Sequence, residues 1–231
     1  MPEMPVLRVT SLKKTYRTPD GERHTIIDIP TFELAEGRQV ALRGSSGSGK
    51  TTFLHMLAGI LRPDSGSIEI DGVDITAAPE SRRDQIRADA IGYIYQTFNL
   101  LQGYTALENV RLAMMFGHGV DDARARGLLE RVGLADRLRY RPRALSVGQQ
   151  QRVAVARALA NRPRIVLADE PTGNLDHRHA AEALRLIRDI CLEFGAALLL
   201  VSHDRAVLEQ FEDVRELSEI NRAASDAKIA S

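Results

Sequence analysis

The sequence predicts an α/β fold: a parallel β-sheet core, an antiparallel β layer near the N-terminus and an inserted all-helical lobe. Three observations predict it. Short, nearly continuous apolar runs indicate strands that are covered on both faces. Helical patterns alternate with these runs, as in a parallel sheet with crossover helices. Residues 6–42 alternate with a period of two instead, which indicates antiparallel strands.

The expected strands of the parallel sheet are residues 39–42, 90–95, 164–169 and 196–202. The segment "KTTFLHMLAGIL" follows the first of them with a helical pattern. A second helical segment, "AAEALRLIRDICLEF", separates the last two. Strand and helix therefore alternate along the chain, which favours the parallel arrangement.

The antiparallel layer is expected within residues 6–42, where the turn-like "TPDGE" breaks the alternation. Residues 65–75 join the same layer, and Asp71 with Gly72 forms a tight-turn signal. The strand signal fades between residues 98 and 156, where helix-like segments are joined by polar loops. We expect one domain over residues 1–217, with its core in 1–96 and 157–217, a helical lobe in 97–156 and a polar tail in 218–231.

Composition limits the class of protein. The 231 residues carry 31 basic and 31 acidic side chains, so the net charge of zero argues against a strongly basic nucleic-acid binder. The single cysteine, Cys191, excludes an internal disulfide, suits a reducing compartment and is expected to be a buried thiol. We see no secretory signal, and the longest apolar run is too short to cross a bilayer. We therefore expect a cytoplasmic protein. If it works at a membrane, another chain must hold it there.

The segment "GSSGSGKTT" fits the phosphate-loop pattern and stands between a strand and a helix. Glycines let several backbone N–H groups wrap closely around polyphosphate oxygens, and the helix N-terminus adds partial positive charge. Lys50 is expected to meet the β- and γ-phosphate oxygens, and Thr51 to offer its hydroxyl to Mg²⁺. The expected ATP-binding residues here are Gly44, Ser45, Ser46, Gly47, Ser48, Gly49, Lys50, Thr51 and Thr52.

Polar residues follow three other buried strands. Because carboxyl ends of parallel strands face the ligand crevice, Asp169 is expected near the phosphates as a Mg²⁺ ligand. The adjacent Glu170 is expected to polarise an attacking water, although two solvated acids at a strand end would look the same. His203 is expected to contact the γ-phosphate, and Gln96 to reach the metal or the water. Taken alone, a histidine is more often structural, and Gln96 would be only a surface amide.

Six motifs, in their order along the chain, resemble those of the ATP-binding-cassette (ABC) ATPases. The set is "GSSGSGKTT", "YQTFN", "LSVGQQQ", "VLADEP", "TGNLD" and "SHD", and the resemblance covers essentially residues 4–211. Within that family, "FNLLQGYTALENV" and "DEPTGNLD" are most similar to the ATPase subunits of lipoprotein-releasing and macrolide-export transporters.

The resemblance implies that two copies pack head to tail around two Mg-ATP molecules. Ser146, Val147, Gly148 and Gln149 of the signature would then face the γ-phosphate that the other copy holds. An ordinary helix cap at Ser146 is the simpler interpretation of the serine alone. The resemblance also implies adenine stacking on Tyr16, a dimer-seam position for Asp176, and transmembrane permease partners that contact Gln96 and the segment after it.

Two departures from the family pattern stand out. Val147 replaces the usual glycine, which would be strained if that position needed a positive φ and harmless in a helix-start conformation. After His203 the family usually closes with a glycine-turn hairpin, but residues 207–227 contain no glycine. We expect the terminal strands to be shortened or altered.

The leading hypothesis is an ATPase subunit at the inner face of the membrane that powers export or extraction by permease subunits. A signalling or cell-division role through a membrane partner is the alternative. A soluble ATPase acting on ribosomes or DNA is less favoured because tandem cassettes and long coiled coils are absent, and a GTPase because Asn-Lys-x-Asp is absent. His177 and His179 lack neighbouring ligands and are expected to be solvated, as is the basic run at 137–143.

Overall fold

The computed structural model describes residues 5–223, and expectations for residues 1–4 and 224–231 lie outside this range. One antiparallel sheet has the strand order β2-β1-β4-β5. Its strands are β1 (Pro5–Arg17), β2 (Arg23–Ala35), β4 (Ser65–Ile70) and β5 (Val73–Asp74). Asp71 and Gly72 connect the last two strands with positive φ angles of 50° and 77°, as a tight hairpin turn requires. The N-terminal antiparallel layer is therefore confirmed.

A five-stranded parallel sheet has the order β6-β7-β8-β3-β9. Its strands are β3 (Gln39–Arg43), β6 (Ile91–Ile94), β7 (Ile165–Asp169), β8 (Ala197–Ser202) and β9 (Asp213–Glu216). Every residue of β7 and β8 is buried, which explains why their sequences are apolar runs without alternation. The four expected parallel strands are thus present, and β9 is added at the edge beside β3.

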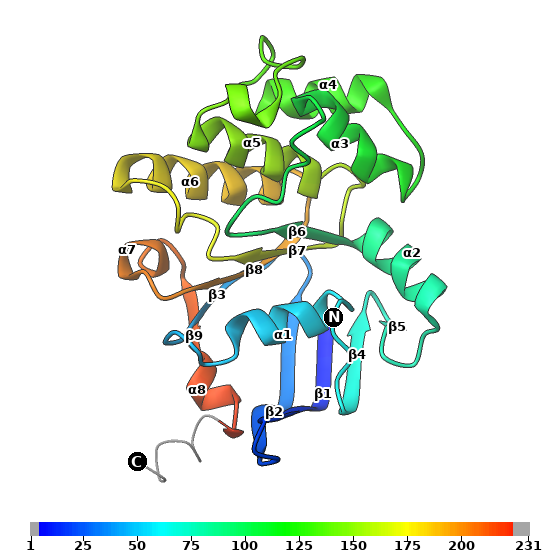
Figure 1. Cartoon of the computed structure of the whole chain (residues 1–231), viewed down its shortest axis with the longest axis vertical. Coiled ribbons are helices and arrows are strands. Elements are labelled where there is room, and N and C mark those ends of the chain that lie inside the picture. The colour runs from blue at the N-terminus through cyan, green and yellow to red at the C-terminus, as the bar shows by residue number, and fades with distance from the viewer. Residues whose placement is uncertain (1–4, 224–231) are drawn as a thin grey trace.

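Helix α1 (Lys50–Leu57) lies between the two sheets (Figure 1). Its buried apolar side chains belong to one hydrophobic core with both sheets. Phe53 contacts Phe32 of β2 edge to face, with ring centroids 5.7 Å apart. The helix ends earlier than its apolar pattern suggests, because Gly59 follows with a φ of 65°. This core fixes the direction of α1 and hence of the phosphate loop at its N-terminus.

The second core lies on the other face of the parallel sheet, under the helical lobe at the top of Figure 1. The lobe holds α3 (Ala106–Met115), α4 (Asp122–Arg131), the 3-10 turn η1 (Pro142–Ala144) and α5 (Val147–Ala158), and α6 (His177–Glu193) packs against α5. Its all-helical character is as expected. Helix α5 continues to Ala158, two residues beyond the expected edge of the lobe at residue 156.

Three helices were not expected. Helix α2 (Glu80–Ala90) buries only Arg83 and Ile86, so its sequence carries no apolar stripe. Helix α7 (Arg205–Leu208) follows β8, and α8 (Leu217–Ile220) follows β9. The expected alteration of the terminal hairpin is confirmed, since a single strand is followed by a helix. At the expected start of the polar tail, residue 218, the structure has helix α8, and Asn221 after it has no exposed surface.

Candidate active site

The phosphate loop connects β3 to α1 and closely approaches β2. Gly47 and Gly49 have φ angles of 79° and 94°, a conformation that L side chains rarely adopt. A Cβ atom on Gly49 would lie 3.0 Å from side-chain carbons of Ile26 and Ile27. Gly49 is also the N-cap residue of α1. The loop therefore needs these glycines both for its turn and for its contact with β2.

Lys50 bridges the loop that it ends. Its Nζ donates hydrogen bonds to the carbonyl oxygens of Gly44 at 2.7 Å and Ser45 at 3.0 Å. The same ammonium lies 3.7 Å from Oε1 of Glu170, and the Lys50 side chain is only 8% exposed. A buried cation held by carbonyl oxygens is well placed to exchange these partners for the charged oxygens of a phosphate.

Asp169 ends β7 beside the first turn of α1. Thr51 Oγ1 donates a hydrogen bond of 3.3 Å to Asp169 Oδ1. Burial raises the pKa of the Asp169 carboxyl, and the Thr51 hydrogen bond opposes that shift. Thr51 and Gln96 line the same hollow beside the phosphate loop, so the hydroxyl that is bonded to Asp169 and an amide face it together. Oxygen donors of this kind fit Mg²⁺.

Glu170 is held by the two residues that end and follow β8. Its Oε1 lies 2.7 Å from Nδ1 of His203, and its Oε2 accepts a hydrogen bond of 3.0 Å from Ser202 Oγ. The backbone of Glu170 has a positive φ of 44°, which is uncommon for a side chain of this size. Strain of this kind persists where surrounding contacts fix a residue, often at functional sites. Ser202 was not singled out in the sequence; its hydroxyl directly before His203 was the available signal.

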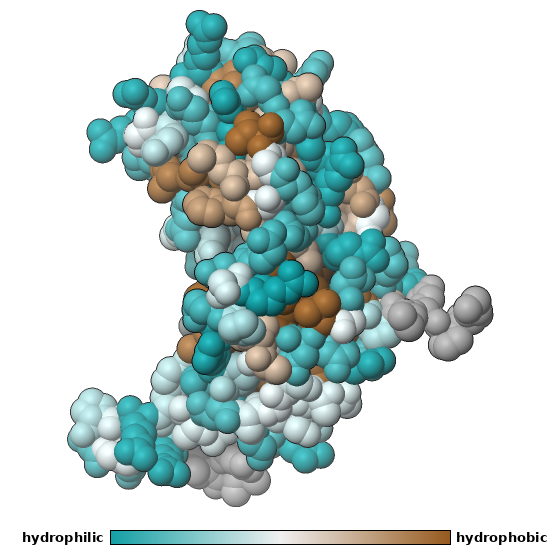
Figure 2. Space-filling view, turned by 90° about the vertical axis from the view of Figure 1, so that its right-hand side faces the viewer, coloured by the Kyte–Doolittle hydropathy of each residue, from teal (hydrophilic) through white to brown (hydrophobic). Residues whose placement is uncertain are grey.

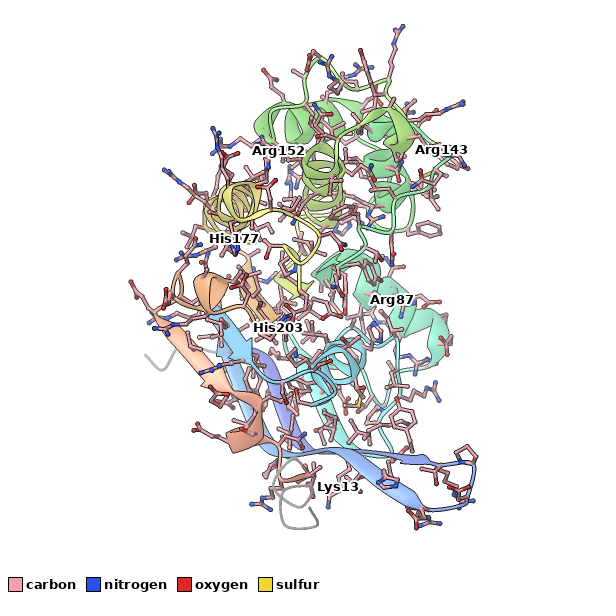
Figure 3. All side chains as sticks on the ribbon, turned by 60° about the vertical axis from the view of Figure 1, so that its left-hand side comes forward. Lys13, Arg87, Arg143, Arg152, His177 and His203 are labelled. Carbon is pink, nitrogen blue, oxygen red and sulfur yellow. The ribbon has the colours of Figure 1, made fainter. Side chains whose placement is uncertain are left out.

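Two hollows flank the phosphate loop. The inner hollow, of about 440 Å³, is lined by Ile26, Ser46, Gly47, Gly49, Lys50, Thr51, Thr52, Gln96, Glu170 and His203. The outer hollow, of about 670 Å³, is lined by Thr25, Ile26, Arg43, Gly44, Ser45, Ser46, Gly47, Ser48, His203, Glu216, Ser218 and Ala223. Figure 3 shows His203 below the helical lobe that carries Arg143 and Arg152. The expected phosphate, metal and water residues are therefore brought together in one place.

The signature turn is a helix start, away from this site. Ser146 Oγ accepts a hydrogen bond from the backbone N–H of Gln149, whose side chain accepts one from the N–H of Ser146. Val147 is the first residue of α5 and is not among the described non-glycine residues with positive φ. The interpretation of Val147 as unstrained is thus supported. Within the described part of the chain, neither hollow is lined by any residue of 146–149.

Tyr16 and Asp176 also lie outside the two hollows. Tyr16 is 43% exposed near the end of β1, opposite His24 of β2, and Lys14 Nζ lies 5.8 Å from its ring centroid. Asp176 is the N-cap residue of α6, and its carboxylate contacts the backbone N–H and Nδ1 of His179. The adenine role of Tyr16 and the seam role of Asp176 are left as proposals.

Two side chains, one fully buried and one partly buried, connect the helical lobe to the site. Gln151 of α5 is fully buried and donates a hydrogen bond to the carbonyl oxygen of Pro171, one residue after Glu170. Arg157 donates to the carbonyl oxygens of Phe98 at 2.7 Å and Asn99 at 2.6 Å. Phe98 and Asn99 both have positive φ, so Arg157 holds the loop after Gln96 in an uncommon backbone conformation.

The remaining expectations concern residues outside the site. Cys191 is fully buried, and burial raises the pKa of its thiol to about 12, so it is an inert core residue as expected. His177, labelled in Figure 3, and His179 are exposed at the start of α6. No group of three or more His, Cys, Asp or Glu side chains within residues 5–223 is arranged to hold a metal ion. No helix in that range is long and apolar enough to span a bilayer.

A glycine-rich loop with a buried lysine, a hydroxyl–carboxylate pair and a second carboxylate held by histidine defines a phosphate-loop nucleotide hydrolase. Comparison with known proteins defines the family. The ABC transporter family model matches residues 27–173. The chain therefore belongs to the ATP-binding proteins of ABC transporters and is an ATPase of that family.

Individual relatives agree with this assignment. The chain is 40% identical over 220 residues to LolD, the lipoprotein-releasing system ATP-binding protein of Pseudomonas syringae pv. tomato, covering 94% of this chain and 96% of that protein. It is 41% identical over 222 residues to an uncharacterised ABC transporter ATP-binding protein of Mycobacterium tuberculosis, covering 94% and 88%. These relatives favour transport over the signalling or cell-division alternative.

Solved structures show the same fold. The dimeric post-hydrolysis state of the ATP-binding cassette MJ0796, bound to ADP and Pi, superposes with a TM-score of 0.82 at 34% identity. The match covers 91% of this chain and 93% of that one. A second dimeric structure of MJ0796 gives a TM-score of 0.81 with the same coverage.

Proposed function

We propose that two copies of this chain hydrolyse Mg-ATP in shared, head-to-tail sites and thereby drive a membrane permease. The observation that carries the proposal is the position of the signature. Ser146 is exposed at a helix start, while the hollows around the phosphate loop of the same chain are open and lack the signature residues within the described range. A helix start whose serine accepts a hydrogen bond through Oγ, and so keeps its O–H to donate, suits the γ-phosphate that a second copy holds.

The residues around the phosphate loop have different proposed roles in binding and hydrolysing ATP. Residues 44–52 wrap the phosphates with backbone N–H groups, and Lys50 offsets charge on the β- and γ-phosphate oxygens. Glu170 accepts a proton from the attacking water; its carboxylate, held by His203 and Ser202, lines the hollow next to the phosphate loop, which supports this role. His203 contacts the γ-phosphate. Tyr16, on the β1–β2 ribbon beyond α1, stacks on the adenine ring.

Thr51, Asp169 and Gln96 would hold Mg²⁺. The hydroxyl and carboxylate oxygens are already 3.3 Å apart, and Gln96 shares the hollow, so the donor set matches the preference of the ion for oxygen. When bound, Mg²⁺ neutralises charge on the β- and γ-phosphate oxygens.

The surface for the permease is placed next to the loop after Gln96. Leu101 and Tyr104 of this loop are 43% and 45% exposed, and Met115 and Phe116 at the C-terminal end of α3 are 64% and 69% exposed. Figure 2, viewed from the side of α2, shows apolar residues at the surface of the helical lobe. An exposed apolar group of this kind fits a protein partner. Such docking would hold the chain at the inner face of the cell membrane, and the lipoprotein-releasing relative makes export or extraction the proposed task.

The variant Glu170→Gln tests this proposal. It keeps the shape of the site but removes the proton acceptor, so Mg-ATP is expected to bind without turnover and to hold two copies together. Light scattering coupled to size exclusion, with and without Mg-ATP, measures the result. Glu130→Gln on the exposed face of α4 is the matched control. Solitary molecules of Glu170→Gln in Mg-ATP, even with the permease present, would contradict the shared site.

A further inference from the structure

The C-terminal segment lies along the outer edge of β2 in the antiparallel sheet. Within the described residues, no strand pairs with this edge. Strand β2 is at the end of that sheet and pairs only with β1. Its outward backbone groups would otherwise need water or another chain as partners. Residues 215–222, which we name the C-terminal strap, run from the end of β9 through α8 beside this edge, as Figure 1 shows.

The strap satisfies the free edge with side chains as well as backbone. Asn221 Nδ2 donates to the carbonyl oxygen of Ile26 at 2.8 Å, and its Oδ1 accepts from the backbone N–H of Asp28 at 2.8 Å. The N–H of Arg222 donates to the carbonyl oxygen of Asp28 at 2.9 Å. Arg215 Nη1 donates to the carbonyl oxygen of Glu33 at 3.0 Å. The amide of Asn221 thus takes the place of a paired strand.

Asn221 is the best-buried polar group in this contact, with no exposed surface. A primary amide that uses both its oxygen and its nitrogen inside the protein is costly to replace, because removing it leaves the partly buried N–H of Asp28 and carbonyl oxygen of Ile26 without this partner. Such a group fixes the position of the backbone that it bonds. The backbone in question is Ile26 to Asp28.

Ile26 leads directly to the nucleotide site. It lines both hollows, and its side chain and carbonyl oxygen approach Gly49 so closely that a Cβ there would lie 3.0 Å and 3.3 Å away. Gly49 is the last glycine of the phosphate loop. On the other side, Ser218 and Ala223 line the outer hollow opposite residues 44–48. The strap therefore contacts the part of β2 that supports the phosphate loop. It also forms part of one wall of the outer hollow.

We propose that Asn221 is a positioning residue for ATP: through Ile26 it sets the phosphate loop, so the strap is part of the nucleotide site. The inference rests on the proposed ATP site in residues 44–52. It gives the glycine-free C-terminal segment a role at the nucleotide site. Loss of the Asn221–Ile26 bond would change nucleotide affinity more than turnover of bound ATP.

Two variants separate positioning from simple stability. Asn221→Asp keeps an acceptor for Asp28 but removes the donor to Ile26, and Asn221→Ala removes both. We expect the Kd for a fluorescent ATP analogue to rise about fivefold for each, with kcat at saturating ATP within about twofold of wild type. Asn161→Ala is the control, because its side-chain amide also donates to two backbone carbonyls, those of Ala88 and Ala113, away from the phosphate loop. It should lower Tm without changing Kd.

Hydrogen exchange of the wild-type chain adds a measurement that needs no variant. ATP should slow exchange in residues 217–222 as well as in 44–52. Protection confined to the phosphate loop, or a folded Asn221→Asp variant with wild-type Kd, would overturn the role of Asn221 and leave the ATPase assignment intact. Absence of ATP binding by the wild type would instead overturn the proposed site itself.

Discussion

Nδ1 of His203 lies 2.7 Å from Oε1 of Glu170, joining an exposed ring to a carboxylate that is only 12% exposed. The contact connects the residue after β8 with the residue after β7, and Ser202 holds the second carboxylate oxygen. The proposed proton acceptor is thus oriented by side chains of the chain itself. Since Nδ1 is engaged with Glu170, the other ring nitrogen is the one available to a phosphate.

Replacing His203 should lower turnover more than binding. His203→Ala removes a side chain that orients Glu170 and the proposed contact to the γ-phosphate, so we expect kcat to fall about 100-fold. The Kd for ATP should change far less, because Lys50 and the phosphate-loop backbone are untouched. Steady-state phosphate release and nucleotide titration measure the two quantities. His177→Ala, at the exposed start of α6, is the control, and equal losses in both variants would refute the assignment.

Cross-linking should join the signature of one copy to the phosphate loop of another. In a Cys191→Ala background, Ser46→Cys combined with Gly148→Cys should yield a covalent dimer on oxidation when ATP is present. Each single-cysteine variant should fail to form that heterologous link. Non-reducing electrophoresis separates the products. A bond formed only within single chains would show that the signature serves its own phosphate loop.

Replacing Asp169 should separate metal use from stability. Asp169→Asn removes a charged oxygen donor from the proposed Mg²⁺ site, so the Mg²⁺ concentration for half-maximal hydrolysis should rise at least about tenfold. Burial raises the pKa of this carboxyl, which means that the charged form is disfavoured without a cation. The nucleotide-free variant should therefore have a Tm no lower than wild type. A marked drop in Tm would mean that Asp169 is mainly a structural partner of Thr51.

Cys191 should make stability decrease at alkaline pH. Its thiol has a pKa raised from 9.0 to about 12 by burial, so the folded chain keeps the proton while the unfolded chain loses it. The free energy of unfolding should be unaffected by this group below pH 9 and should then fall by up to about 1.4 kcal/mol per pH unit as pH rises towards 12. Urea unfolding of wild type and Cys191→Ala at pH 8 and 10 measures the difference. A pH-independent difference would contradict a buried, protonated thiol.

Much of the fold was predictable because its signals are local. The phosphate loop, the paired acids after β7 and the histidine after β8 each follow a short apolar strand, and parallel strands bring their ends together. The cap at Ser146 was equally local: a serine followed three residues later by a glutamine. The unstrained Val147 follows from the same helix start.

Contacts between distant segments were not predictable. Helix α2 buries too few apolar residues to leave a periodic pattern, and the order of the strands depends on packing of the whole chain. Ser202 bonds Glu170 across 32 positions, and Asn221 bonds Asp28 across 193. A serine before a histidine and an asparagine in a polar tail carry no sign of such partners, because burial decided their roles.

The Gln151–Pro171 hydrogen bond joins two parts of one chain that would act on different ATP molecules in a head-to-tail pair. Helix α5 would present Ser146 to the nucleotide bound by the second copy. The backbone after Glu170 would instead lie at the nucleotide bound by its own chain. A fully buried amide makes this joint stiff. Hydrolysis at one of the two ATP sites would then shift the signature turn that closes the other site. The two sites should therefore hydrolyse ATP alternately rather than independently.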